Sequence, residues 1–171
     1  MKLLKDGKPV TDDWVHLDDA DPAPAAGGVI VSLDRWRAER DALLKRGQVG
    51  IRLKSNEAPA EIRDDLGHFG VIALEFPVYR DGRAFSYARL LRERFGYKGE
   101  LRAVGNVLFD QLAFMHRCGF DAFEVQKDPD ADRFAKALTA FSVRYQRAAD
   151  DAQTALELRH KARRNVAQEG R

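Results

Sequence analysis

Short apolar runs, several of them rich in β-branched residues, alternate with amphipathic stretches along most of this chain. Such alternation is typical of β-α units, in which a helix follows each strand. The predicted strands lie at residues 28–33, 49–55, 71–79, 101–107 and 121–125, and the predicted helices at residues 35–46, 58–67, 86–96, 110–119 and 130–146. Strands separated by helices pair in parallel through right-handed crossovers, so we predict an α/β protein with about five β-α units and a mainly parallel sheet.

Residues at the ends of these segments support the assignment. Asp34 is placed to cap the first helix, and Gly47 is placed to end it, because helix C-termini favour glycine. Pro59 lies in the first turn of the second helix, where its missing N–H costs nothing. The third helix is expected to begin near Ser86.

One face of the predicted sheet is polar. Parallel strands that helices cover on both faces are usually apolar throughout, yet here Ile51 and Leu53 alternate with charged residues. If this alternation stays in register, it gathers one set of side chains on a single concave surface: Arg52, Lys54, Glu75, Arg102, Glu124 and Gln126. We therefore favour a half-barrel (TIM-like) with helices on one face, and an open three-layer sheet is the alternative.

The two ends of the chain differ from the central α/β domain, which we assign to residues 28–147. Residues 1–27 are predicted to form a β-hairpin and a linker, with a strand at MKLLK, a turn at Asp6-Gly7-Lys8-Pro9 and a second strand through Trp14, Val15 and Leu17. Residues 148–171 are predicted to form a helical, basic tail. That tail is either solvated or docks on an acidic partner.

Composition limits the classes of function. The 171 residues include 44% apolar residues, enough for the core of one domain, and 29 basic against 27 acidic side chains give a net charge of +2. No field of the whole chain attracts nucleic acid or an anionic membrane, and no apolar run approaches the length of a membrane span. We expect a soluble, cytoplasmic protein whose anion sites, if any, are local.

The sequence contains no recognisable motif for a metal site or a cofactor site. A single cysteine, Cys118, rules out an internal disulfide and any four-cysteine metal site within one chain. The histidines lack metal-ligand spacing, and neither the G-x-G-x-x-G nor the G-x-x-x-x-G-K-[ST] fingerprint follows a strand. Cys118 lies at a helix end, where the helix dipole raises the pKa of a thiol, so we expect it to be inert.

The loop Arg80-Asp81-Gly82-Arg83 is the sharpest candidate for anion binding. It follows a predicted strand and leads into the helix near Ser86, so free backbone N–H groups and the guanidinium groups of Arg80 and Arg83 can meet an oxyanion. In the structural alternative, Asp81 and Gly82 make the turn, Ser86 caps the helix, and the arginines pair with nearby carboxylates.

The next β-α unit offers a similar set at its strand-to-helix turn: Arg102, Asn106, Asp110 and Gln111. If the two units are adjacent, these residues line one crevice beside Arg83, and Arg52 and Lys54 add cations on the polar face. Glu75 and Glu124 are then candidate acids or bases, with Arg102 as a further catalytic candidate. In the alternative, Asp110 caps its helix and Arg102 is paired inside the sheet.

Residues 81–93 (DGRAFSYARLLRE) and 96–124 (GYKGELRAVGNVLFDQLAFMHRCGFDAFE) carry a family resemblance. Together they resemble DUF934, a bacterial family of uncharacterised proteins, and the similarity extends over about residues 25–147. Members are described as oxidoreductases involved in sulfite reduction, a description that rests on their gene neighbours in sulfate assimilation. The resemblance implies a place in that process and gives no mechanism.

Two functions follow from these observations. The first is an accessory protein of assimilatory sulfate or sulfite reduction that binds sulfite reductase, another enzyme of sulfate assimilation or an oxyanion. Any flavin or siroheme would then reach it only through that partner. The second is an enzyme, an oxidoreductase acting on a small anionic substrate in a polar pocket at the carboxyl ends of the strands.

The aromatic residues around the arginine-rich loop favour a protein partner if they are exposed: Tyr79, Phe85, Tyr87, Phe95 and Tyr97.

Overall fold

The computed structural model describes residues 2–5, 7–125, 131–140, 142–150 and 152–169. Eight strands form one sheet in the order β2-β1-β8-β7-β6-β5-β4-β3, in which β3 to β8 pair in parallel and β1 is antiparallel to both of its neighbours. Their bounds are β1 (Lys2–Lys5), β2 (Lys8–Val10), β3 (Trp14–His16), β4 (Gly28–Ser32), β5 (Val49–Leu53), β6 (Phe69–Phe76), β7 (Glu100–Gly105) and β8 (Ala122–Val125). The mainly parallel α/β architecture is confirmed.

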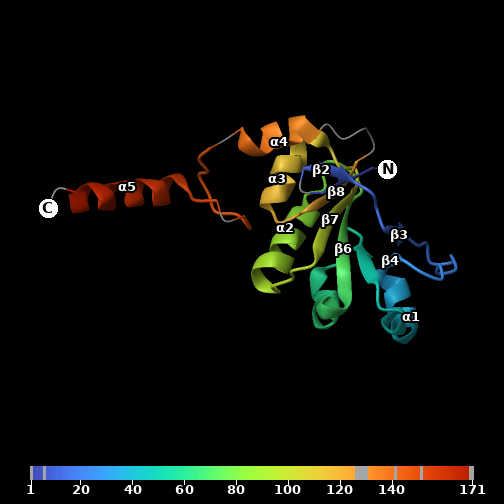
Figure 1. Ribbon diagram of the computed structural model, residues 1–171. Helices are drawn as coiled ribbons and strands as arrows, with labels where there is room; N and C mark the ends of the chain where they lie inside the picture. The colour runs from blue at the N-terminus through green and yellow to red at the C-terminus, as the bar shows by residue number, and fades with distance from the viewer. Residues whose placement is uncertain (1, 6, 126–130, 141, 151, 170–171) are drawn as a thin grey trace.

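From β4 to β8, helices connect successive parallel strands and cover one face of the sheet, and two more of the described helices follow β8 (Figure 1). Their bounds are α1 (Leu33–Arg46), the 3₁₀ helix η1 (Pro59–His68), α2 (Arg83–Arg89) with its π-helical continuation η2 (Leu90–Arg94), the 3₁₀ turn η3 (Phe109–Gln111), α3 (Leu112–Arg117), α4 (Ala131–Thr139) and α5 (Ala155–Glu169). The main core lies between these helices and the sheet, where alternate strand residues such as Ile51, Leu74 and Phe123 are buried. Burial of that apolar face drives the fold.

The opposite face of the sheet is concave, because the sheet curls back toward itself. His16 on the edge strand β3 lies 2.7 Å from a carboxylate oxygen of Glu124 on β8, although four strands separate β3 from β8 in the sheet order. This closure confirms the predicted half-barrel and excludes the open three-layer sheet.

Trp14 fills the amino-terminal end of the concave face. A Cβ atom on Gly28 would lie 2.6 Å from its indole ring, and one on Gly70 would lie 3.0 Å from it, so glycine at both positions makes room for the ring. Trp14 packs against a small apolar cluster that includes Ile30, Val71 and Val104. The half-barrel is therefore filled at one end and leaves room at the carboxyl ends of its strands.

The N-terminal hairpin is present, but its predicted second strand was wrong. Lys2–Lys5 pairs with Lys8–Val10, whereas Trp14–His16 forms β3 at the far edge of the sheet, parallel to β4. The physical reason is that Trp14 packs its indole across the concave face beside Gly28, which a hairpin strand next to β1 would not allow.

The helix ends also differ from the predictions in detail. Ser32, and not Asp34, caps α1, because the strand ends at Ser32 and its hydroxyl accepts a hydrogen bond from the backbone N–H of Arg35. Gly47 ends α1 with φ of 94°, as predicted. The helix expected near Ser86 begins at Arg83, and the helix expected to reach residue 146 ends at Thr139.

The helix α5 projects away from the half-barrel in Figure 1. It is separated from α4 by residues 140–154, in which the described residues form only turns, bends and one isolated bridge between Arg144 and Thr154. Within the described part of the chain, no helix is both long and apolar enough to cross a membrane.

Candidate functional site

Charged side chains from neighbouring strands meet on the concave face. The strand register places Arg52, Ala73 and Arg102 in one row across β5, β6 and β7. Glu75 and Glu124 lie two residues further along their own strands and point to the same side. The polar face predicted from the alternation thus brings together Arg52, Glu75, Arg102 and Glu124.

Arg102 is the centre of an ion-pair network that fills part of this face. Its side chain is fully buried and donates hydrogen bonds to Glu124 at 2.9 Å, to Asp12 at 2.7 and 3.1 Å, and to Glu100 at 2.8 Å. Burial opposes the charge on the guanidinium group, but these carboxylates outweigh that effect and raise the pKa of Arg102. The charge is satisfied within the protein.

Glu124 joins this network to the edge of the sheet. Its carboxylate contacts both Arg102 and His16, and the contact with His16 holds the two sides of the half-barrel together. Burial favours the neutral carboxyl group, yet the hydrogen bond with His16 and the charge of Arg102 lower the pKa of Glu124 below its ordinary value. Glu124 is therefore ionised at neutral pH.

A cavity of about 340 Å³ opens beside the network at the carboxyl ends of the strands. It is lined by Lys2, Leu3, Asp12, His16, Arg52, Glu75, Val104, Gly105 and Glu124. Arg52 and Glu75 are both partly buried, and among the described residues neither has a hydrogen-bond or ion-pair partner. A cation and an anion thus face the cavity, and no described residue neutralises either of them.

Gly105 shapes the wall of this cavity. Its φ of 88° is the left-handed conformation that favours glycine, and a Cβ atom here would lie 2.6 Å from the backbone oxygen of Phe76. The backbone N–H of Asn106 then donates a hydrogen bond of 2.7 Å to the same oxygen. This close approach fixes the ends of β6 and β7 beside Glu75.

The arginine-rich loop lies outside the cavity. Arg83 donates hydrogen bonds to Asp81 at 2.6 and 2.9 Å and to Ser55 at 2.9 Å, and its hydrogen bond lowers the pKa of Asp81 strongly. Arg80 is exposed over the ring of Tyr79. Ser86 is exposed within α2 and caps no helix. Of the structural alternative, the structure contains the pairing of Arg83 with Asp81 but neither a cap at Ser86 nor a carboxylate partner of Arg80 among the described residues.

Most of the other predicted binding residues also lie away from the cavity. Lys54 is exposed and lies 3.9 Å from Glu57. Asn106 and Asp110 are exposed, and the Oε1 atom of Gln111 is buried without a hydrogen-bond partner in the described structure. None of these four residues lines this cavity. Gln126 lies outside the described residues.

Asp12, His16 and Lys2 were not predicted from the sequence. They reach the cavity because β3 is at one edge of the sheet, β1 is the second strand from the other edge, and the curled sheet brings the two sides together. One sequence feature could have drawn attention to Asp12 and His16: in Asp12-Asp13-Trp14-Val15-His16, two acids and a histidine flank a tryptophan. That feature marks these residues as functional candidates, but it does not say where the segment lies in the sheet.

The aromatic residues near α2 divide into buried and exposed groups. Tyr97 is buried, and Phe85 packs against Phe76 and Phe114 with ring centroids 5.1 and 5.0 Å apart. Tyr79 is 59% exposed and Phe114 is 56% exposed. Val78, beside Tyr79 after β6, and Leu108, after β7, are also exposed, so the exposed apolar group consists of Val78, Tyr79, Leu108 and, on α3, Phe114.

Cys118 is buried, and burial raises the pKa of its thiol. A thiol in this state is a poor nucleophile. Among the described residues, no group of three or more His, Cys, Asp or Glu side chains is arranged to hold a metal ion.

The fold and the site together define an α/β half-barrel protein with a charged cavity at the carboxyl ends of its parallel strands. Residues 50–156 match the model of a family described as bacterial protein of unknown function (DUF934), and since this match covers more than half of the chain, the protein belongs to that family. Neither the curated proteins nor the solved structures contain a match to this chain.

Proposed function

We propose that this protein is an accessory protein of assimilatory sulfate or sulfite reduction and that it binds a small oxyanion in the concave cavity. The observation that carries the proposal is the guanidinium group of Arg52, which has no partner among the described residues and faces a cavity of about 340 Å³. A planar guanidinium group forms paired hydrogen bonds with oxyanions. The place in sulfur metabolism rests on the gene neighbours by which DUF934 members are described, since the family model itself is described as of unknown function.

Arg52 and Glu75 together favour a protonated oxyanion. Arg52 attracts the negative charge, whereas the carboxylate of Glu75 repels a second negative charge and accepts a hydrogen bond. Hydrogensulfite satisfies both groups, because it carries one negative charge and one acidic proton. Sulfate is fully deprotonated at neutral pH, so the carboxylate of Glu75 repels it and receives no hydrogen bond from it. We therefore expect sulfite to bind more tightly than sulfate.

The exposed apolar group beside the cavity supports the partner role. Val78 and Tyr79 follow β6, Leu108 follows β7, and Phe114 lies on α3, and all four side chains are exposed. Aromatic residues near arginines are common at the centres of protein interfaces. A reductase that docks here, such as sulfite reductase, would meet an anion held by Arg52 and would itself carry any flavin or siroheme.

One observation favours the alternative, an enzyme that acts on the same small anion. The hydrogen bond of 2.7 Å between His16 and Glu124 lies in the cavity wall, and Glu75 faces the same space. A carboxylate and a histidine in contact can exchange a proton with a bound substrate. In this alternative Glu75 or Glu124 is the acid or base, whereas Arg102 already donates to three carboxylates.

Calorimetric titration with sulfite and with sulfate tests the proposal. We expect sulfite to bind with 1:1 stoichiometry and Arg52→Gln to reduce its affinity at least about tenfold, the usual effect of losing one charge-assisted hydrogen bond. Glu75→Gln is expected to weaken sulfite binding and strengthen sulfate binding, because an amide donates a hydrogen bond where the carboxylate accepts one.

Lys54→Gln is the matched control. It removes the same charge from the same strand end, but Lys54 is exposed and outside the cavity, so its affinity for sulfite should equal that of the wild type. Equal losses in Arg52→Gln and Lys54→Gln would indicate a general charge effect. No binding of sulfite or sulfate by the wild type would overturn the proposal.

A further inference from the structure

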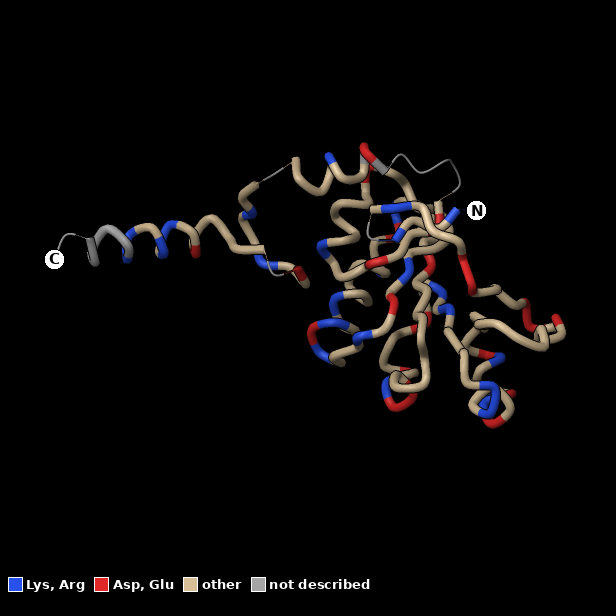
Figure 2. Tube along the Cα trace, viewed as in Figure 1, with Lys and Arg blue, Asp and Glu red and all other residues tan. Residues whose placement is uncertain are grey.

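Charge is distributed unevenly between the projecting helix and the rest of the chain. Residues 155–171 contain five of the 29 basic residues and two of the 27 acidic residues, so the remaining chain holds 24 basic and 25 acidic residues. The net positive charge of the protein thus resides in the segment that contains α5. Figure 2 shows basic residues repeated along α5, away from the half-barrel.

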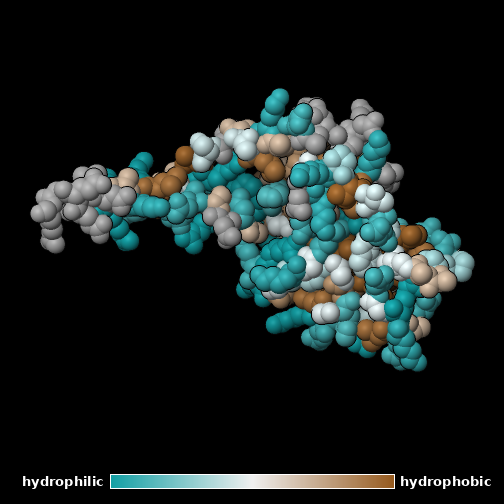
Figure 3. Space-filling view, viewed as in Figure 1, coloured by the Kyte–Doolittle hydropathy of each residue, from teal (hydrophilic) through white to brown (hydrophobic). Residues whose placement is uncertain are grey.

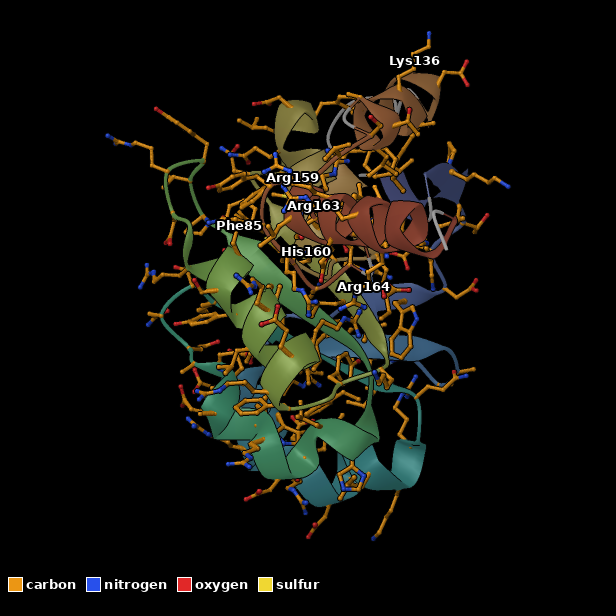
Figure 4. The ribbon with its side chains drawn as sticks, turned by 90° about the vertical axis from the view of Figure 1, so that its left-hand side faces the viewer. Phe85, Lys136, Arg159, His160, Arg163 and Arg164 are labelled. Carbon is orange, nitrogen blue, oxygen red and sulfur yellow. The ribbon has the colours of Figure 1, made fainter. Side chains whose placement is uncertain are left out.

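The basic side chains of α5 are available for intermolecular contact. Arg159, Lys161, Arg163 and Arg164 are exposed, and within the described residues none of them has an ion-pair partner. Figure 4 labels Arg159, His160, Arg163 and Arg164 along the helix as it points toward the viewer. Their charges are therefore not used to hold α5 against its own domain.

An apolar residue lies among these cations. Leu156 is 60% exposed, and it occupies the same face of the helix as Arg159, His160 and Arg163, because these positions follow the i, i+3, i+4, i+7 spacing. Figure 3 shows apolar surface at the start of α5. The exposed face of α5 is thus a basic strip with one large apolar side chain.

The opposite end of the molecule has the complementary composition. From Pro9 to Asp34 the chain contains six aspartates and neither lysine nor arginine. All six are exposed, and Asp12 pairs with Arg102. Four others lie within residues 12–21, and among the described residues none of their carboxylates forms an ion pair: Asp13, Asp18, Asp19 and Asp21. Val15, which lies between them in sequence, is 51% exposed on the edge strand β3. We name residues 12–21 the acidic edge.

We propose that the basic face of α5 docks on the acidic edge of a second copy of this protein. The two surfaces match in charge, and each offers one exposed aliphatic side chain, Leu156 on the helix and Val15 on the edge strand. They lie at opposite ends of the molecule in Figure 2, so the two surfaces of one copy do not meet each other and the contact joins two copies. Exposed ion pairs are individually weak, so this association is concentration-dependent and sensitive to salt.

This contact also places a second copy near the cavity. Asp12 and His16 belong to the acidic edge and line the cavity wall. The docked helix therefore lies close to the site where we propose that the oxyanion binds. The docking itself does not depend on that proposal, because it rests on α5 and the exposed aspartates alone.

Analytical ultracentrifugation of the full chain at several protein concentrations tests the docking. At low ionic strength we expect the weight-average mass to rise with concentration to at least that of a dimer. At about 1 M salt, where the Debye length is about 3 Å, we expect the monomer mass. A monomer at every concentration in low salt would overturn the proposal.

Two charge-reversal variants make the test specific. One carries Arg159→Glu, Lys161→Glu, Arg163→Glu and Arg164→Glu, and the other carries Asp13→Lys, Asp18→Lys and Asp21→Lys. Each variant alone should be monomeric, and their equimolar mixture should associate again, because the acidic helix of one meets the basic edge of the other. Circular dichroism identifies a variant that has lost its fold.

Failure of the mixture to associate while both variants remain folded would overturn the proposal. A matched control carries Lys45→Glu, Arg80→Glu, Arg94→Glu and Lys98→Glu, which reverse the same number of exposed cations outside α5 and should leave the association unchanged. Equal dissociation by this control would also contradict the docking, since it would mean that net charge alone governs association. Binding of wild-type protein to DNA or to anionic vesicles, without any self-association, would assign α5 to a different partner.

Discussion

The concave face contains two regions with the same kinds of charged side chains. In one region these charges are paired with each other, and in the other they have no partner among the described residues. Around Arg102, three carboxylates and a buried guanidinium group satisfy one another. Around Arg52, a guanidinium group and a carboxylate face an open cavity, and neither has a partner among the described residues. The two arginines occupy one row of the sheet, with only Ala73 between them.

This difference separates a structural role from a binding role. Charges inside a fold are tolerated when they are paired and hydrogen-bonded, and the network around Arg102 meets that condition. The carboxyl ends of parallel strands are a common place for ligand binding, and the charges at this end without a described partner support the proposed oxyanion site. Hence Arg102 is paired within the fold, whereas Arg52 is the arginine that we propose binds a ligand.

The largest effect that this comparison predicts is on stability at Arg102. Arg102→Met leaves Glu124, Glu100 and Asp12 without their shared cation, and removing one partner of a buried ion pair costs about 3–5 kcal/mol. Urea unfolding should report a loss of that size. A loss below about 1 kcal/mol would mean that the network is not what holds the concave face together.

The second prediction concerns the wall between the two regions. Gly105→Ala should destabilise the protein by about 2–3 kcal/mol, because it combines a strained φ with a Cβ atom 2.6 Å from a backbone oxygen. Gly47→Ala is the matched control: its φ is 94°, but no atom lies within 4 Å of the added Cβ. It should cost only about 1 kcal/mol. Equal losses in thermal unfolding would contradict the close approach at Gly105.

The third prediction is a pH dependence from Glu124. Its pKa is lowered in the folded protein, so its contribution to stability is complete above the pKa of the unfolded chain and is lost as the pH falls through the folded value. Glu124→Gln should therefore lose stability at neutral pH and show a flatter decline between about pH 5 and pH 3. Denaturant midpoints across that range measure the effect. A decline as steep as that of the wild type would assign the acid sensitivity to other carboxylates.

The smallest predicted effect is at Arg52. Arg52→Met removes a charge that no described residue neutralises, so the free energy of unfolding should change by no more than about 0.5 kcal/mol. The same urea titration used for Arg102→Met gives the comparison directly. A loss as large as that at Arg102 would mean that both arginines are structural.

Much of the fold was predictable from local pattern. The alternation of Ile51 and Leu53 with charged residues indicated a sheet with one polar face, and the half-barrel follows from it. Gly47 ended its helix as expected because its position requires positive φ. Trp14–His16 was misplaced because a three-residue strand contains no pattern that specifies which strand it pairs with.

The candidate site was less predictable, because its contacts span most of the chain. Asp12 contacts Arg102 across 90 residues, and His16 contacts Glu124 across 108 residues. Such contacts depend on how far the sheet curls. The curvature is a property of the whole sheet, so it cannot be predicted from the sequence of any single segment. Arg83 looked like a binding residue, but its own neighbour Asp81 takes up its charge, and sequence spacing cannot tell a paired arginine from an unpaired one.

The most direct test of the central claim is a nitrogen-15 NMR titration of the protein with sulfite, followed at backbone amides and arginine side chains. The account predicts that the changes gather around the cavity, at Arg52, Glu75 and Gly105, and that the Nε–H signals of Arg83 and Arg102 stay unchanged. Changes centred on the loop from Arg80 to Arg83, or the absence of any change, would contradict it.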